Sequence, residues 1–464
     1  MLAAPGPGRP AARLPLAPVE WACLALGTIV GLAFLEHEIL FPSAFDAAQY
    51  VNMAQEIAER GLFSKVEGSE MRTYGYPWVA SLVLRIAGAT GITFVVLLFA
   101  VQFAAYVAAA FFLRRALAPA SAIVARIAFC GLLVNVFAVI YTPESLTESL
   151  SLTLLVLTAA LWVIQWRSRL AAWPVLLGSL IAGFAFVVRP ANLFVVAVWC
   201  FGLALLWYRQ RPPFARTAAL ASVAVAGLAL PLAPQVAINA TYYGKATPLP
   251  TADLGLFQQV VGIRFLKYAT GLPPVPQAPV GYRNPMLIGT VLNDAAPLGW
   301  YAEHPLRGVA TTLLHTFNLT DQDLLFTYSR DLNPWYRVPL GVVNHAAVAL
   351  GIVGLWLAGR RVRRHRHARD AFIVLLALIA ANWAVYAWTA VEMRFGATLL
   401  LVLFPFAGYA MIDVARRGPR MRRAVALATG VYVVLALVLS GWVRDQSPLI
   451  RNESITVASS KAIV

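Results

Sequence analysis

The sequence has few charged residues and many long apolar runs. Only 12% of its 464 residues are Asp, Glu, Lys or Arg, whereas 60% are hydrophobic. A soluble fold of this length could not cover so many apolar side chains with polar surface. The composition therefore excludes an ordinary soluble protein and indicates that the protein lies in a membrane.

Cysteine and histidine are also scarce. Cys23, Cys130 and Cys200 all fall inside apolar runs, where a thiol behaves as a small hydrophobic side chain. The six histidines are scattered and show no spacing typical of metal ligands. We therefore expect no metal and no cofactor, and nothing in the sequence supports a divalent cation.

Nucleotide-binding motifs are missing as well. The chain has neither a Gly-x-x-x-x-Gly-Lys loop nor a Rossmann fingerprint in a strand-turn-helix setting, and it has no Gly-x-Ser-x-Gly elbow. The basic connections between apolar runs are too short to form a domain that binds ATP or a nucleotide sugar. These absences exclude a cytoplasmic nucleotide-dependent domain and leave serine hydrolase chemistry without support.

The apolar runs predict an all-α polytopic membrane protein. Crossing a bilayer core takes about 20 apolar residues, and about eleven segments approach that length. They are residues 17–40, 91–113, 121–140, 149–166, 173–188, 192–207, 217–238, 338–357, 371–390, 396–412 and 424–443.

The distribution of charge predicts which ends of the spans face the cytoplasm. Basic residues are retained on the cytoplasmic side during insertion. With the N-terminus inside, the inner segments hold about 21 Arg or Lys against about three acids, and the outer segments hold about 16 basic and about 18 acidic residues. We therefore expect a cytoplasmic N-terminus. Lys is scarce and Arg abundant, which fits a GC-rich bacterial genome, so we expect a bacterial inner membrane. The basic runs serve as anchors, and the net charge of +16 does not indicate nucleic-acid binding.

Two outer connections are too long to be simple loops. Residues 41–90 are expected to form two interfacial helices, and residues 239–337 an ordered periplasmic cap. We therefore divide the chain into an N-terminal transmembrane catalytic module (1–238), the cap (239–337) and C-terminal transmembrane helices (338–464). Acidic and polar residues gather on this outer side, which predicts a periplasmic active site.

The first outer connection carries two candidate motifs. Asp46 follows the first span with Tyr50 one helical turn later, so both lie on one face, where the carboxylate can accept a proton from a hydroxyl. An acid complementing a helix N-terminus would give the same pattern. Arg72 and Tyr74 precede an apolar helix, and a guanidinium there suits a lipid phosphate. Interfacial anchoring is the alternative for this second motif.

Three further motifs place charges at the ends of apolar runs. Glu144 and Glu148 lie four residues apart and could bind sugar hydroxyls, although Ser145-x-x-Glu148 also matches a capping box. Arg189 interrupts two apolar runs, and Glu392-Met-Arg394 ends another. Charges bounded by apolar sequence are costly to bury and are candidates for function, or they neutralise one another locally.

Taken in order, these motifs resemble those of the C-type (GT-C) integral membrane glycosyltransferases, especially relatives of protein O-mannosyltransferases and the lipid A aminoarabinose transferase. The motifs that carry the resemblance are Asp46-Ala-Ala-Gln-Tyr50, Arg72-Thr-Tyr-Gly-Tyr-Pro77, Thr142-Pro-Glu-Ser-Leu-Thr-Glu148, Arg189-Pro190, Asn239-x-x-Tyr-Tyr-Gly244, Trp300-Tyr-Ala-Glu-His-Pro305 and Glu392-Met-Arg-Phe395. One departure is Ala47, because many members have a second acid directly after the catalytic one.

The resemblance implies an inverting transfer of a sugar from a polyprenyl-phosphate donor to an envelope lipid, glycan or protein. It implies that Asp46 is the catalytic base. We expect Arg72, Tyr74, Arg189 and Arg394 to hold the donor phosphate. The expected sugar and acceptor ligands are Tyr50, Glu144, Glu148 and Glu392. The alternative function is a transporter or flippase of a lipid-linked saccharide, which would carry polar residues along a path at the membrane midplane.

Overall fold

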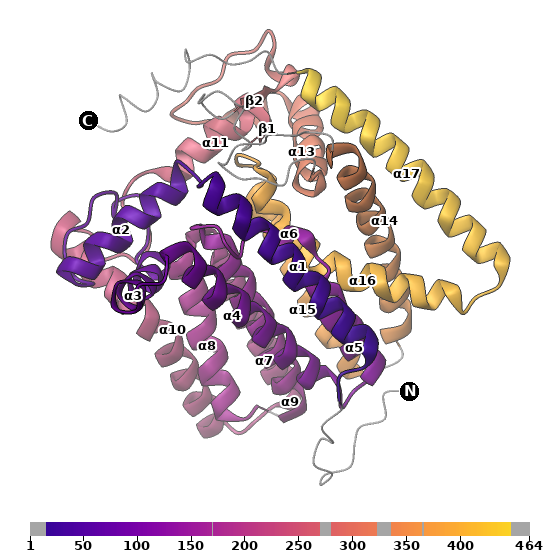
Figure 1. The fold of residues 1–464 in the computed structure, drawn as a ribbon, viewed down its shortest axis with the longest axis horizontal. Coiled ribbons are helices and arrows are strands. Elements are labelled where there is room, and N and C mark those ends of the chain that lie inside the picture. Colours follow the sequence, from indigo (N-terminus) through magenta and orange to yellow (C-terminus); the bar gives the residue numbers. More distant parts are fainter. Residues whose placement is uncertain (1–14, 169, 270–279, 323–335, 364–365, 447–464) are drawn as a thin grey trace. The chain divides into compact units, whose positions relative to one another are not determined.

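A computed structural model describes residues 15–168, 170–269, 280–322, 336–363 and 366–446 (Figure 1). The chain forms two compact units. The first comprises residues 1–252, 347–382 and 398–423, and the second comprises residues 253–346, 383–397 and 424–464. This grouping follows contacts in space, and the three-part division expected from the sequence stays a prediction.

The first unit is helical wherever the structure describes regular secondary structure in it. Its N-terminal part contains α1 (Pro18–Leu40), α2 (Asp46–Arg60), α3 (Gly75–Thr90), α4 (Phe94–Leu117), α5 (Ala122–Leu133), α6 (Val136–Val139), α7 (Thr147–Ser168), α8 (Ala172–Val188), η1 (Pro190–Asn192), α9 (Leu193–Gln210) and α10 (Phe214–Tyr243). Helix α8 packs against α10 and α7, and α7 packs against α4. The most apolar window of α7 is 72% buried, against 17% for α1, so α7 lies at the centre of this bundle.

The second unit combines helices with a small sheet. It contains α11 (Leu254–Arg264), β1 (Phe265–Ala269), β2 (Val280–Arg283), η2 (Pro285–Leu287), α12 (Gly299–Glu303), α13 (Pro305–Thr320) and η4 (Met393–Gly396). Strands β1 and β2 pair antiparallel with an irregularity after Phe265. The remaining long helices are α14 (Arg337–Val362), α15 (Arg366–Tyr386), α16 (Ala397–Ala415) and α17 (Pro419–Asp445).

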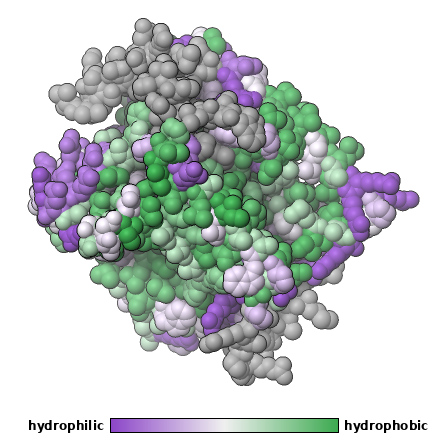
Figure 2. Space-filling view, in the orientation of Figure 1, coloured by the Kyte–Doolittle hydropathy of each residue, from purple (hydrophilic) through white to green (hydrophobic). Residues whose placement is uncertain are grey.

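Within the described residues, nine helices are long and apolar enough to cross a membrane, which confirms a polytopic, essentially all-α membrane protein. They are α1, α4, α7, η1 with α9, α10, α14, α15, η4 with α16, and α17. Hydrophobic residues accordingly cover much of the face shown in Figure 2. The other two segments expected to span, 121–140 and 173–188, form shorter apolar helices.

These two segments are short for different reasons. The helix expected over 121–140 ends at Leu133, and Asn135, with extended backbone, separates α5 from α6. Asn is a poor residue for a helix interior, because its side chain competes for backbone hydrogen bonds. Helix α8 ends where Pro190 follows Arg189, and its 17 residues reach only about 26 Å.

Residues 41–90, expected to be an outer connection, fold into the two helices that their sequence predicts. Helix α2 buries its apolar side chains, including Tyr50, Met53 and Ile57, and leaves Glu59 and Arg60 exposed. Gly61, at φ 92°, ends it in a conformation that other residues rarely adopt. Helix α3 packs on α2 and also approaches α8 closely, since a Cβ on Gly75 would lie 2.5 Å from the Val187 carbonyl oxygen.

Candidate functional site

Asp46 and Arg72 form an ion pair immediately beyond the first span. Asp46 is the first residue of α2, and its Oδ1 lies 2.5 Å from a terminal nitrogen of Arg72. The Arg72 Nε donates to the Gln49 side chain at 3.2 Å. The preceding residue, Phe45, has φ 52° and provides no side-chain cap. Asp46 is therefore not the N-cap of α2, although it still lies in the first turn, where a negative charge is favourable.

Two tyrosines connect this pair to the interior. The Arg72 guanidinium lies over the Tyr50 ring at 5.2 Å, and the Tyr50 ring meets the Tyr76 ring edge to face. Tyr76 is 1% exposed, and its hydroxyl points toward the Glu144 carbonyl at 3.5 Å. Burial and then the carboxylate of Glu148 raise the pKa of Tyr76 well above its ordinary value. Tyr76 is thus a neutral hydroxyl and cannot serve as a base near pH 7.

The Glu144–Glu148 motif lies beside these tyrosines. Glu148 accepts a hydrogen bond from Arg189 at 2.7 Å and is 1% exposed in its side chain. Glu144 is also buried, and Gln102 donates to its backbone carbonyl at 3.1 Å. Arg189 reaches this site because η1 interrupts the helix between α8 and α9. Glu148 is therefore a partner of Arg189 across the bundle.

Exposure distinguishes Asp46 from the neighbouring acids. Its side chain is 20% exposed, whereas Glu38, Glu144 and Glu148 are buried. A general base must come within hydrogen-bond reach of the acceptor hydroxyl. Among these four carboxylates, Asp46 is the one that a second substrate can reach without rearrangement of the bundle.

The Asn239-Ala-Thr-Tyr-Tyr-Gly244 motif anchors the loop that carries Arg72. The Tyr242 hydroxyl donates to the Phe63 carbonyl at 2.7 Å, and the hydroxyls of Tyr243 and Ser69 lie 2.6 Å apart. Asn239 is fully buried and donates from its amide to the carbonyls of Thr247 and Leu249 at 2.6 and 2.8 Å. The motif at the end of α10 therefore fixes the position of the loop.

Tyr74 also belongs to this anchor. Its hydroxyl donates to the Pro231 carbonyl at 2.7 Å, and its backbone N–H donates to the Gln235 side chain at 2.9 Å. Burial raises the pKa of Tyr74 to about 12. Tyr74 faces α10, whereas Arg72 faces α2. Its expected contact with the donor phosphate stays a prediction.

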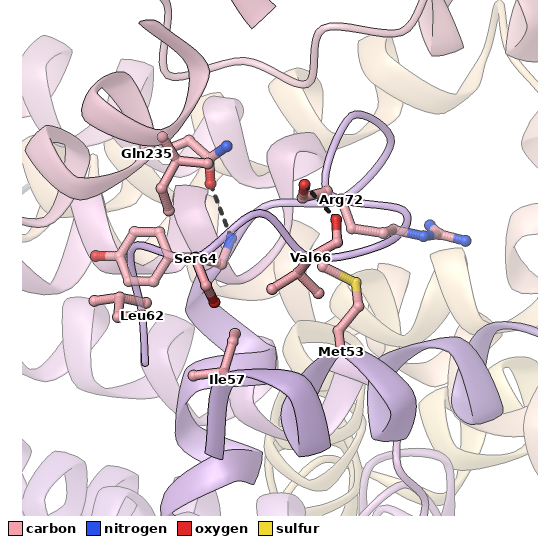
Figure 3. A pocket seen from close by; sticks show the side chains of 10 residues that line it. Met53, Ile57, Leu62, Ser64, Val66, Arg72 and Gln235 are labelled. Carbon is pink, nitrogen blue, oxygen red and sulfur yellow. Dashed lines mark hydrogen bonds between the residues drawn. The ribbon is translucent and has the colours of Figure 1, made fainter. Parts of the chain in front are cut away.

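A small cavity lies behind the loop, between α2 and α10. Its volume is about 10 Å³, room for about one water molecule, and apolar side chains such as Met53, Ile57 and Ile238 form much of its lining. Figure 3 shows the Arg72 guanidinium directed away from Ile57 and Leu62. The cavity is too small to bind a sugar. The guanidinium of Arg72 points away from its apolar lining and is available to a ligand on the other side of the loop.

Glu392 and Arg394 lie in the second unit. They pair with each other at 2.5 Å, and both are largely buried. The backbone of Tyr268 in β1 bonds to Val391, which connects this motif to the small sheet. In this pair the two charges neutralise each other, which agrees with the alternative interpretation of the motif. Their predicted contacts with donor and acceptor stay predictions.

One further acid near the site was missed by the sequence patterns. Glu38, near the end of α1, accepts hydrogen bonds from the backbone N–H and the hydroxyl of Ser43 at 2.9 and 2.8 Å. These bonds hold the turn that leads into Phe45 and Asp46. An acid just before the end of an apolar run was an available signal, because such charges are costly unless paired.

Among the described residues, no three His, Cys, Asp or Glu side chains are placed to hold one metal ion. The expectation that the protein needs no cofactor stays a prediction.

The chain is similar in structure to an archaeal oligosaccharyltransferase. With AglB from Archaeoglobus fulgidus, in complex with an inhibitory peptide and a dolichol-phosphate, the TM-score is 0.44 and the identity 13%, over 94% of this chain and 57% of that one. The A. fulgidus enzyme tethered to an acceptor peptide gives 0.41 and 14%, over 90% and 53%, and its apo form gives 0.42 and 13%, over 90% and 54%.

This chain thus spans little more than half the length of those enzymes. The sequence matches no protein-family model and no curated protein. A likeness of this size does not assign the chain to a family.

Proposed function

We propose that the protein is a membrane glycosyltransferase that moves a sugar from a polyprenyl-phosphate donor to a hydroxyl acceptor of the bacterial cell envelope. The observation that carries this proposal is the pairing of Asp46 with Arg72 directly beyond the first span, at 2.5 Å and partly exposed. A carboxylate that can take a proton and a guanidinium that can hold a phosphate are the two groups such a transfer needs.

The transfer is a single displacement. The acceptor oxygen forms a bond to the anomeric carbon while the bond from that carbon to the phosphate oxygen breaks, and the sugar inverts. Asp46 takes the acceptor proton, and the polyprenyl phosphate leaves with the bonding electrons. A phosphate needs little acid assistance to leave, so one carboxylate suffices where glycoside hydrolysis commonly uses two.

Arg72 couples donor binding to the activity of the base. While Arg72 pairs with Asp46, the guanidinium stabilises the carboxylate and weakens it as a proton acceptor. A donor phosphate competes for the same guanidinium and accepts its fork-shaped donors bidentately. Donor binding would then loosen the hold of Arg72 on Asp46, and the base becomes effective when a sugar is present.

The remaining residues of the cluster complete the site. Tyr50, which lies beside Arg72, keeps its expected role as a ligand of the sugar or acceptor, and the buried Tyr76 and Glu144 lie behind it. The ion pair of Arg189 with Glu148, within the helical bundle, supports this part of the site. The expected roles of Arg394 with the donor phosphate and of Glu392 with the sugar or acceptor stay predictions. The excess of basic residues on the opposite ends of the spans supports a periplasmic site, where a sugar must arrive on a lipid because nucleotide sugars are cytoplasmic.

Reconstitution tests the proposal. The full-length protein in lipid nanodiscs is given radiolabelled polyprenyl-phosphate sugars and envelope fractions as acceptors, and the release of polyprenyl phosphate is measured. We expect release that depends on the acceptor and is absent for Asp46→Asn. Movement of labelled lipid between the leaflets of a liposome without any release would establish the flippase alternative instead.

A further inference from the structure

Helix α13 in the second unit buries three polar side chains and exposes three large apolar ones. Leu306, Val309 and Leu313 share one face, by their spacing of three and four residues, and are 86%, 58% and 64% exposed. Thr311, His315 and Asn318 are fully buried. This arrangement is the reverse of a helix that packs on a core and faces water.

The buried polar residues of α13 have protein partners. Asn284 donates to the Thr311 hydroxyl at 3.0 Å, and Asn318 donates to the Leu266 carbonyl at 2.9 Å. Both ring nitrogens of His315 lie near backbone carbonyls, and burial lowers its pKa. These contacts fix the orientation of α13 within its unit. Because its polar residues face inward, the face with the exposed apolar residues points outward.

Helix α2 provides the contrast within the same chain. It has 15 residues, nearly the length of α13 with 16, but its apolar residues are buried and Asn52, Gln55 and Glu59 are exposed. This pattern is typical of a helix whose outer face is in water. The outer face of α13 instead resembles that of α17, a candidate span, whose Val431, Val434 and Val438 are 52%, 60% and 67% exposed.

Leaving the outer face of α13 in water would be unfavourable. Moving a large aliphatic side chain out of water is favourable, and three such residues line this face. Ile288, which is 74% exposed, lies close to α13, since its carbonyl accepts a hydrogen bond from Arg307 at 2.8 Å. An arginine beside such a surface is typical of the headgroup level, where its stem lies in the apolar layer and its charge meets phosphate.

We propose that α13 is a lipid-contacting helix, which lies in the interface of the bilayer with Leu306, Val309 and Leu313 in the hydrocarbon. Its length of about 24 Å is too short to cross a core of about 30 Å, so it rests in one leaflet. Part of the segment expected to form a periplasmic cap would therefore be embedded in the bilayer. This inference does not depend on the enzymatic activity.

Spin-label accessibility tests the inference. Single cysteines replace Leu306, Val309 or Leu313 in a full-length protein whose Cys23, Cys130 and Cys200 are changed to alanine. After nitroxide labelling in nanodiscs, the collision rates with oxygen, which concentrates in lipid, and with a water-soluble nickel chelate are compared. Val434→Cys serves as the lipid-facing control and Glu59→Cys as the water-facing control.

We expect the ratio of oxygen to nickel accessibility at all three α13 positions to match Val434→Cys and to exceed Glu59→Cys. A ratio like that of Glu59→Cys would place the helix in water and overturn the inference. Low accessibility to both reagents, with an immobilised label, would show a protein partner on this face and would overturn it as well.

Discussion

Arg72 holds three residues of α2 at once. It pairs with Asp46, donates to Gln49 and lies over the Tyr50 ring. A lysine at this position keeps the charge but has one compact ammonium in place of a planar fork. Removing one donor that stabilises a developing negative charge lowers turnover by about 10²–10³-fold, so we expect a loss of that order in kcat/KM for the donor with Arg72→Lys.

Arg60→Lys is the matched control for Arg72→Lys. Arg60 is the last residue of α2, is 63% exposed in its side chain and pairs with Glu56 at 3.5 Å. Exposed pairs of this kind contribute about 0–1 kcal/mol, and turnover should not change. Wild-type kcat/KM in Arg72→Lys would remove the guanidinium from the donor site.

Asp321 predicts a pH dependence in the second unit. Its carboxylate lies 3.0 Å from the ammonium of Lys267, and both side chains are at most 2% exposed. Burial alone would raise the pKa of Asp321, but Lys267 and His345 hold it at about 2, below its ordinary value of 3.8. Because the folded value is the lower one, the pair stabilises fully above the ordinary pKa and is lost as the pH falls toward about 2.

We therefore expect the thermal midpoint of the wild type to fall as the pH drops from about 4 to about 2. Asp321→Asn leaves a buried ammonium without its partner, which costs about 3–5 kcal/mol near neutral pH. Asp294→Asn, which removes a pair with Arg264 that is 54% exposed on the Asp294 side, should have little effect. Equal acid sensitivity in Asp321→Asn and wild type would contradict this assignment.

At the scale of single elements, the close approach of α3 to α8 sets where the Arg72 loop lies. Gly75 has the Val187 carbonyl oxygen 2.5 Å from the position of a Cβ, and Gly88 in the same helix has nothing within 4 Å. Gly75→Ala should force the helices apart at a cost of about 1–3 kcal/mol. Gly88→Ala should stabilise by about 0.4–1 kcal/mol, because it reduces the entropy of the unfolded chain.

Thermal unfolding of both alanine variants in detergent checks this prediction. The midpoint should fall for Gly75→Ala and should hold or rise for Gly88→Ala. A Gly75→Ala protein as stable as Gly88→Ala would mean that α3 does not approach α8 as described.

The elements that the sequence predicted best are those with a local cause. Apolar length alone located nine spans, and amphipathic spacing with Gly61 located α2 within one residue. The break at Asn135 and the pairing of β1 with β2 were not predicted. A strand of five residues or a break at a single Asn without proline leaves little mark on hydrophobic periodicity.

The sequence indicated candidate residues for the site, but it did not indicate which of them contact each other. Asp46 was expected as the catalytic base and Arg72 as a ligand of the donor phosphate, and the structure shows that they also pair with each other across 26 positions of the chain. Tyr74 faces α10, and Glu38 was not recognised. A spacing in sequence says which residues share a helix face, but the partner on another element follows only from the packing of α2, α3 and α10.

For the whole molecule, the distribution of charge predicts the orientation in the membrane. Glu67 lies in the outer connection and Arg417 between the last two spans, and both are exposed. In the cysteine-free background, Glu67→Cys should react with a membrane-impermeant maleimide in intact spheroplasts, and Arg417→Cys should react only after permeabilisation. The reverse pattern would place the Asp46 site in the cytoplasm and contradict the lipid-linked donor.

The role of Asp46 is the central claim, and single-turnover transfer by Asp46→Asn in nanodiscs tests it most directly. Asparagine keeps the size of the side chain but cannot take the acceptor proton, so the rate should fall by about 10²–10⁴-fold while the donor still binds and the thermal midpoint is kept. Glu56→Gln, the control on the same helix, should transfer at the wild-type rate. Transfer by Asp46→Asn at the wild-type rate would contradict the account.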